Sequence, residues 1–183
     1  VALGVSANAL TASSLLFGAA AGLAVAFGRF GMATLFGLLA ALVDTLDGQV
    51  ARATGTTSTA GKLFDATADR YVEAALFVGI VFYVRASAPL LLLTLAALIA
   101  SFLVSYVSAK IEAYPNVSVP RGAMRRGERL VLLTLGTGLV PAVARLFPST
   151  ASLVPLIVAL AIIAVAGNFS AVRRLLHLAR SAP

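Results

Sequence analysis

All four aspartates of this 183-residue chain lie between positions 44 and 69, in the pattern Asp44-x2-Asp47-Gly48-x2-Ala51-Arg52-x8-Gly61-x3-Asp65-x3-Asp69. The segments on both sides are apolar, and a charged side chain at the centre of a bilayer costs about 2.5–3.5 kcal/mol. Crowded carboxylates also repel one another unless divalent cations neutralise them. The pattern therefore predicts a divalent-metal site, and we expect this site to carry the chemistry.

The residue types restrict which metal can bind. The chain has no cysteine and a single histidine, His177, so neither thiolates nor a group of imidazoles can form the site. Oxygen ligands remain, and they favour hard ions such as Mg²⁺ or Mn²⁺. Four carboxylates supply enough oxygen atoms for two such ions, with coordination positions left for a ligand. We therefore predict two divalent ions, Mg²⁺ or Mn²⁺.

Helical spacing would bring the aspartates together. Asp44 and Asp47 are three residues apart and Asp65 and Asp69 are four apart, so each pair shares one face of a helix. The run at 54–59 is rich in Gly, Ser and Thr and predicts a turn between two antiparallel helices. Small residues on or beside the same face, Gly48 and Ala51, leave room for a flat ligand, or else serve close helix packing.

The composition is that of a membrane protein. Hydrophobic residues make up 60% of the chain, charged residues only 11%, and the mean hydropathy is +1.00, whereas soluble domains carry about 25% charged residues. Apolar stretches long enough to cross a bilayer recur at 10–27, 33–53, 63–84, 89–111, 130–147 and 152–175. The sequence therefore predicts an all-α integral membrane protein. Its six transmembrane helices would form one bundle and one domain over 1–183, with the active site at the cytoplasmic end.

The basic residues predict the orientation. If both termini lie on one side, eleven of the 14 Lys and Arg residues fall on that side, which by the positive-inside rule is cytoplasmic. These eleven are Arg52, Lys62, Arg70, Lys110, Arg121, Arg125, Arg126, Arg129, Arg173, Arg174 and Arg180. The other side carries Arg29, Arg85 and Arg145. We expect the termini and the aspartates to be cytoplasmic in the cell membrane, where the basic residues could also meet anionic lipid headgroups.

This pattern resembles the signature of the CDP-alcohol phosphotransferases, D-x2-D-G-x2-A-R-x8-G-x3-D-x3-D, at every fixed position. Members of that family are integral membrane enzymes and generally homodimers. They transfer a phosphatidyl or related phosphoryl-alcohol group from a CDP-linked donor to an acceptor hydroxyl and release CMP. The resemblance implies phospholipid synthesis with a CDP-linked lipid donor, a small polar alcohol acceptor and no nucleic-acid partner.

The resemblance also implies roles for individual residues. Asp44, Asp47, Asp65 and Asp69 would hold the two metal ions, and Asp69 would in addition act as the general base on the acceptor hydroxyl. The CDP-binding residues would be Gly48, Ala51, Arg52, Gly61 and Lys62.

A second basic region points to the acceptor. The segments Tyr106-x2-Ala109-Lys110-x-Glu112 and Arg125-Arg126-x-Glu128-Arg129 are similar to Y-x-x-A-R-x-E and E-R-x-E-R. These stretches occur in the family branch that makes phosphatidylinositol phosphate or its archaeal ether analogue. Lys110 replaces an arginine, Arg125 a glutamate, and Ser108 stands where that branch often has a lysine. We expect Lys110, Arg126 and Arg174 to bind a phosphate already present on the acceptor, as in inositol phosphate.

Other possibilities remain open from the sequence. Glycerol phosphate is the main alternative acceptor, and serine or another neutral alcohol is a further one. A divalent-metal transporter would also place carboxylates in a membrane, and a non-catalytic scaffold could retain the fold. Near the start of the chain, Asn8 and Thr11 resemble the P-N-x-x-T entry to the family's first helix, and N-capping is an equally good interpretation.

Overall fold

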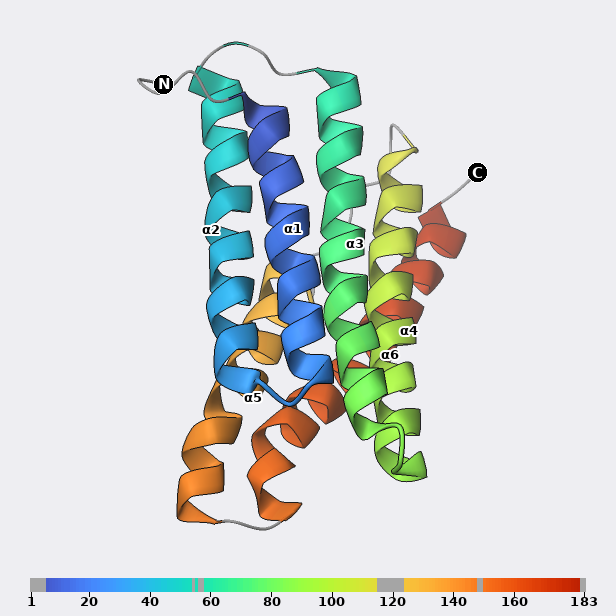
Figure 1. The fold of residues 1–183 in the computed structure, drawn as a ribbon. Helices are drawn as coiled ribbons and strands as arrows, with labels where there is room; N and C mark the ends of the chain where they lie inside the picture. The colour runs from blue at the N-terminus through green and yellow to red at the C-terminus, as the bar shows by residue number, and fades with distance from the viewer. Residues whose placement is uncertain (1–5, 54, 56–57, 115–123, 148–149, 182–183) are drawn as a thin grey trace. The chain divides into compact units, whose positions relative to one another are not determined.

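The computed structural model describes residues 6–53, 55, 58–114, 124–147 and 150–181, and within these ranges all regular structure is helical. These residues form six α-helices and one short 3-10 helix, and the α-helices are labelled in Figure 1. They are α1 (Ala7–Ala26), α2 (Phe30–Ala53), α3 (Thr59–Val84), α4 (Ala88–Glu112), α5 (Arg126–Leu146), η1 (Thr150–Leu153) and α6 (Val154–Ser181). The six predicted apolar stretches all fall on these helices, and the predicted turn at 54–59 separates α2 from α3.

Five helices are long and apolar enough to cross a membrane: α1, α2, α4, α5 and α6. Helix α3 is of similar length, but it carries Lys62, Asp65, Asp69, Arg70 and Glu73 in its first four turns. These charged residues lower its hydropathy and give it the composition of a helix that lines a polar site. An all-helical membrane protein is thus supported, and the sixth span stays a prediction.

The chain divides into two compact units, Val1–Tyr83 and Val84–Pro183. In the first unit, glycines let α1 and α3 approach until their backbones touch. A Cβ added to Gly22 would lie 2.3 Å from the carbonyl oxygen of Ala75, and one added to Gly79 would lie 2.1 Å from that of Gly22. No side chain fits there, so these glycines determine the spacing of the two helices.

Local signals begin and end the helices of the first unit. Ser6 is the N-cap of α1, and its hydroxyl accepts a hydrogen bond from the backbone N–H of Ala9 at 3.3 Å. Between α2 and α3, Gly55 adopts a φ of +66°, a conformation that glycine reaches at little cost. Ser58 then accepts a hydrogen bond from the N–H of Gly61 at 3.0 Å, which is the N-cap pattern for α3.

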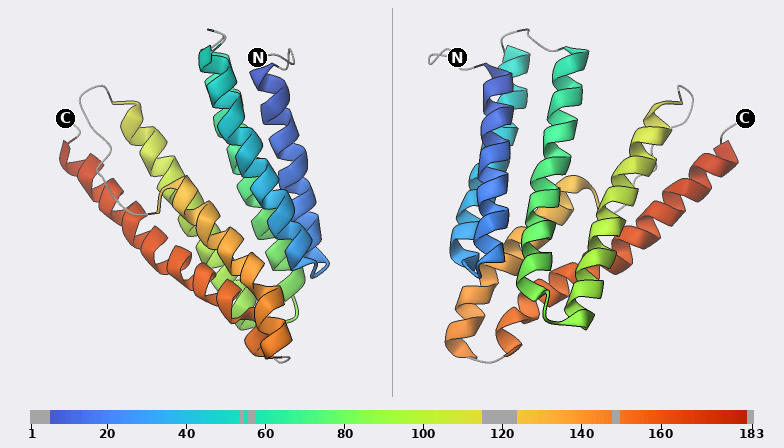
Figure 2. Two further views of the ribbon diagram at one scale, coloured as in Figure 1. Left: turned by 90° about the vertical axis from the view of Figure 1, so that its left-hand side faces the viewer. Right: turned by 45° about the vertical axis from the view of Figure 1, so that its right-hand side comes forward.

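The second unit consists of α4, α5, η1 and α6. Helices α4 and α6 run side by side in the views of Figure 2 and contact each other. Small residues form that contact, since a Cβ on Gly167 would lie 2.9 Å from the Cβ of Ala100. Helix α5 packs on α6 in the same way, with Gly136 against Ala159. The core face of α5 begins at Arg129 and continues through Leu133.

Candidate functional site

Three of the four signature aspartates converge in the first unit. Asp44 and Asp47 come from the second half of α2, and Asp65 comes from the beginning of α3. One oxygen atom of each carboxylate lies within 4.8 Å of those of the other two. Because Mg²⁺–oxygen distances are about 2.0–2.1 Å and Ca²⁺–oxygen distances about 2.3–2.6 Å, small adjustments would let one ion contact all three. We refer to Asp44, Asp47 and Asp65 as the aspartate group.

The fourth aspartate, Asp69, lies one helical turn after Asp65 on α3, half-buried and outside the aspartate group. One turn further, Glu73 is buried and forms an ion pair with Arg70 at 2.9 Å. The geometry thus supports a metal site of three carboxylates. A second ion shared with Asp69 stays a prediction.

Asp47 is the buried member of the aspartate group, with 5% of its surface exposed. Its Oδ2 accepts a hydrogen bond from the Thr11 hydroxyl at 2.5 Å. The same hydroxyl also lies 3.1 Å from the Ala7 carbonyl oxygen, one turn earlier on α1. A hydroxyl has one proton to donate, and the shorter contact is the one to Asp47. Thr11 therefore fixes one carboxylate of the group from a different helix.

A cavity of about 400 Å³ lies beside the aspartate group. Its lining includes all five residues predicted to bind CDP, namely Gly48, Ala51, Arg52, Gly61 and Lys62. The remaining lining residues are Ala7, Asn8, Thr11, Asp47, Ser58 and Asp65. The lining thus combines two carboxylates and two cationic side chains with small and polar residues.

The two glycines of this cavity lie under polar groups. A Cβ on Gly48 would meet the guanidinium of Arg52 at 3.3 Å, and a Cβ on Gly61 would meet the Ser58 hydroxyl at 3.1 Å. Arg52 is exposed in the last turn of α2 and lies over bare backbone at Gly48. The two glycines thus let the Arg52 guanidinium and the Ser58 hydroxyl lie close to the backbone beside the cavity.

Three lining residues were missed or left undecided by the sequence analysis. Ser58 gave no signal beyond the turn run that contains it. For Asn8 and Thr11, the capping interpretation is wrong, because Ser6 caps α1 and both residues line the cavity instead. The resemblance of this segment to the family's first-helix entry was the signal that could have found them.

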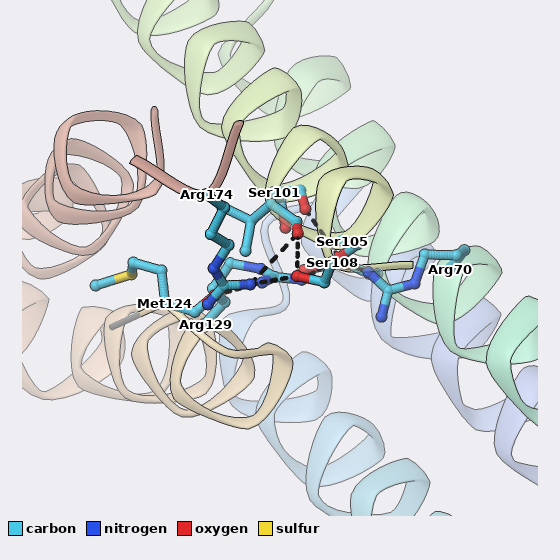
Figure 3. A network of polar contacts seen from close by, with 9 residues as sticks. Arg70, Ser101, Ser105, Ser108, Met124, Arg129 and Arg174 are labelled. Carbon is cyan, nitrogen blue, oxygen red and sulfur yellow. Dashed lines mark hydrogen bonds and ion pairs between the residues drawn. The ribbon is translucent and has the colours of Figure 1, made fainter. Parts of the chain in front are cut away.

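A cluster of buried arginines characterises the second unit. Arg129 has 1% of its surface exposed and Arg174 has 5%. Arg129 donates hydrogen bonds to the Met124 carbonyl oxygen at 2.6 Å and to the Ser105 hydroxyl at 3.0 Å. Arg174 donates to the Ser108 hydroxyl and to the Val104 carbonyl oxygen. Figure 3 shows the two guanidinium groups next to each other, and we call them the arginine cluster.

The three predicted acceptor residues are in different environments. Arg174 belongs to the arginine cluster, and Arg126 is partly exposed at the beginning of α5. Lys110 is exposed, with its ammonium group 5.6 Å from the centre of the Tyr106 ring. Arg121, which the sequence analysis placed on the same side, lies outside the described residues. Arg129 was not among the residues predicted to form the site. Its helical spacing from Leu133 could have indicated that it lies on the buried face of α5.

The residue before the N-cap of α5 has an unusual backbone. Met124 has a φ of +68°, which is uncommon for a residue with a side chain. Its N–H donates to Glu128 Oε2 at 2.6 Å, while its carbonyl oxygen accepts from Arg129. The side chains of Glu128 and Arg129 thus bind both backbone polar groups of Met124. These contacts fix the position at which Arg125 and Arg126 begin the helix.

Comparison with known proteins places these residues in context. A family model described as CDP-alcohol phosphatidyltransferase matches residues 4–172. The phosphatidylinositol phosphate synthase of Mycobacteroides abscessus is 36% identical over 129 residues, which cover 66% of this chain and 58% of that protein. This chain thus spans little more than half the length of that relative.

Two solved structures have a similar fold. The phosphatidylinositol phosphate synthase of Mycobacterium tuberculosis with CDP-DAG bound has a TM-score of 0.83 at 27% identity, over 96% of this chain and 87% of that one. The same enzyme in complex with manganese and citrate has a TM-score of 0.84 at 27% identity, over 98% and 85%.

Proposed function

The chain belongs to the CDP-alcohol phosphatidyltransferase family, and we propose that it is a phospholipid-synthesis enzyme. It would transfer a phosphatidyl group from a CDP-linked lipid, such as CDP-diacylglycerol, to the hydroxyl of a phosphorylated polyol such as inositol phosphate, releasing CMP. The observation that carries this proposal is the cavity beside the aspartate group, which is lined by every predicted CDP-binding residue. The CDP-DAG-bound relative supports the donor, and the names of the relatives support the acceptor.

The aspartate group would hold divalent metal. Its donors are all carboxylate oxygens, which suit Mg²⁺ or Mn²⁺, and manganese occurs in a structure of the Mycobacterium tuberculosis relative. We propose two ions, with Asp69 as the fourth ligand. When bound, divalent metal supplies positive charge that stabilises the phosphoryl oxygens and the departing CMP.

The protein's own groups would orient the donor. Arg52 and Lys62 border the cavity, and their charges match a pyrophosphate. Gly48 lets the Arg52 guanidinium lie close to the backbone of α2, and Gly61 does the same for the Ser58 hydroxyl at the beginning of α3. Asp69 would accept the proton of the attacking acceptor hydroxyl as general base.

The acceptor phosphate would be recognised by Lys110, Arg126 and Arg174. Arginine suits this task because its guanidinium presents paired donors to phosphate oxygens. Arg174 supports the proposal most strongly, since its buried guanidinium lies next to that of Arg129 and the two together concentrate positive charge.

The membrane arrangement is part of the proposal. We propose six transmembrane helices in one domain over 1–183, with the site at the cytoplasmic end and a homodimer as the assembly. The five apolar helices and the family match over 4–172 support this arrangement. The donor's acyl chains could then stay in the bilayer while its headgroup enters the cavity.

The test is a comparison of acceptors. Purified protein with CDP-diacylglycerol and Mg²⁺ is given inositol phosphate, glycerol phosphate, inositol or serine, and both CMP and the lipid product are measured. Inositol phosphate should give the highest kcat/KM. A higher value for glycerol phosphate would reassign the acceptor. If no acceptor gave CMP release and the protein carried divalent metal across the membrane of proteoliposomes, the proposed function would change from enzyme to transporter.

A further inference from the structure

The last turns of α6 carry a groove that the proposed reaction does not use. Its volume is about 330 Å³, and all its lining residues belong to α6. Half of the lining residues are apolar and half are basic or titratable: Phe169, Val172, Leu176, Arg173, His177 and Arg180. The apolar ones are well exposed, with 71% of the surface of Phe169 and 50% of that of Leu176 accessible.

The basic residues at the end of α6 lie in two different environments. Arg173, His177 and Arg180 follow one another at intervals of four and three residues, so they share one face. Arg174 is buried and donates to Ser108, whereas its neighbour Arg173 lines the outer groove. Helix α6 contains no Asp or Glu. Its outer face therefore carries positive charge that no carboxylate of the same helix balances.

The position along α6 matches the depth of lipid headgroups. Helix α6 begins at Val154 and has no charged residue before Arg173. At 1.5 Å per residue, Arg173 lies about 29 Å along the axis from Val154 and Arg180 about 39 Å. The hydrocarbon core of a bilayer is about 30 Å thick. If Val154 lies at one edge of the core, both arginines reach the opposite headgroup layer.

We propose that this groove binds an anionic phospholipid. Arg173 and Arg180, with His177 between them, would contact the headgroup phosphate, and Phe169, Val172 and Leu176 would pack against the first methylene groups of an acyl chain. Charge complementarity argues for the anionic headgroup, and the apolar half of the groove argues for a lipid in preference to a soluble phosphate. The site is separate from the donor cavity, whose lining residues all belong to the first unit.

The experiment uses a photoreactive phosphatidylglycerol and the purified full chain in phosphatidylcholine vesicles. Crosslinks should map to peptides that contain residues 169–180. Arg173→Gln/Arg180→Gln should weaken capture roughly thirtyfold, because each cation near an anionic surface contributes about 1 kcal/mol. Arg173→Lys/Arg180→Lys should retain most of the capture. High salt should lower the capture by the wild type toward that of the Gln variant.

The matched control is Arg85→Gln/Arg145→Gln, which removes the same charge from two exposed arginines outside the groove. It should leave capture unchanged. The proposal is overturned if this control loses capture equally, if crosslinks map outside α6, or if excess soluble glycerol phosphate displaces the lipid. Size-exclusion profiles of all variants ensure that the comparison is made between folded proteins.

Discussion

The two units hold their charged side chains in opposite ways. In the first unit, three carboxylates come within 4.8 Å of one another, and like charges at that distance repel. In the second unit, the arginine cluster donates to neutral oxygen atoms, the hydroxyls of Ser105 and Ser108 and the carbonyls of Met124 and Val104. The aspartate group brings together acidic oxygen atoms that suit a divalent cation, whereas hydrogen bonds from the protein orient the arginine cluster.

This difference shows how each region meets a ligand. Hydrogen bonds to oxygen atoms of the protein orient the two guanidinium groups, so the arginine cluster presents positive charge in a fixed arrangement to an anion. The aspartate group suits the opposite charge, because its three carboxylates gather oxygen atoms within 4.8 Å of one another. Changes in the first unit should therefore alter metal and donor dependence, and changes in the second should alter acceptor dependence.

The largest effect should follow removal of the metal. After exhaustive chelation, we expect CMP release to fall to background, because the metal would supply the charge that stabilises the phosphoryl oxygens and the departing CMP. Restoring Mg²⁺ or Mn²⁺ should restore the rate. Undiminished CMP release in excess chelator would contradict the metal site, and the contrast between the two regions would lose its basis.

Asp69→Asn should have the next largest effect. The amide keeps the shape but cannot accept a proton, and general-base catalysis contributes about 10²–10⁴-fold. We expect turnover to fall by that factor while CDP binding, measured by calorimetry, changes little. Asp65→Asn is the control and should weaken both, because Asp65 belongs to the aspartate group and also lines the cavity. Turnover near that of the wild type in Asp69→Asn would assign the base elsewhere.

Arg174→Gln should act on the acceptor. Loss of a charge-assisted contact costs about 1.5–3 kcal/mol, so the apparent KM for a phosphorylated acceptor should rise roughly tenfold to a hundredfold, with a smaller change for the donor. Lys110→Gln and Arg126→Gln should shift KM in the same direction. Arg145→Gln, which removes an exposed arginine at the end of α5, should leave the acceptor KM unchanged. An equal KM rise for an acceptor without phosphate would show that Arg174 supports the fold and does not recognise phosphate.

The sequence predicted the first unit better than the second for a physical reason. Asp44, Asp47 and Asp65 are charged residues at helical spacing in an apolar chain, so the cost of burying them points directly to a ligand. Arg129 is charged too, but its orientation depends on a hydrogen bond to Ser105, which is 24 positions away along the chain. The helical periodicity of apolar residues places Arg129 on the buried face of α5, but it does not show which residue accepts its hydrogen bond.

Other features lay beyond what sequence reasoning could reach. The φ of +68° at Met124 arises from contacts to Glu128 and Arg129, and methionine itself gives no sign of it. The close approach of α1 and α3 depends on Gly22, and small residues are too common in membrane helices to identify the partner of such a glycine. Gly79 and Ala75 complete that contact from α3.

The smallest effect we predict tests the hydrogen bond between the Thr11 hydroxyl and Asp47 of the aspartate group. Thr11→Val keeps the shape of the side chain and removes the hydroxyl that bonds Asp47. Loss of a group that orients a metal ligand typically costs 10–100-fold in metal affinity or activity. Here the metal itself would hold Asp47 in place, so we expect about a tenfold rise in the metal concentration for half-maximal rate, at the low end of that range. Thr11→Ser should restore the wild-type value.

Ser108→Ala is the matching change in the second unit. Arg174 keeps its contact to the Val104 carbonyl oxygen, so the acceptor KM should change only a few-fold and the metal requirement should not change. If Ser108→Ala altered the metal requirement, or Thr11→Val altered only the acceptor KM, the two regions would not have the separate ligands proposed for them.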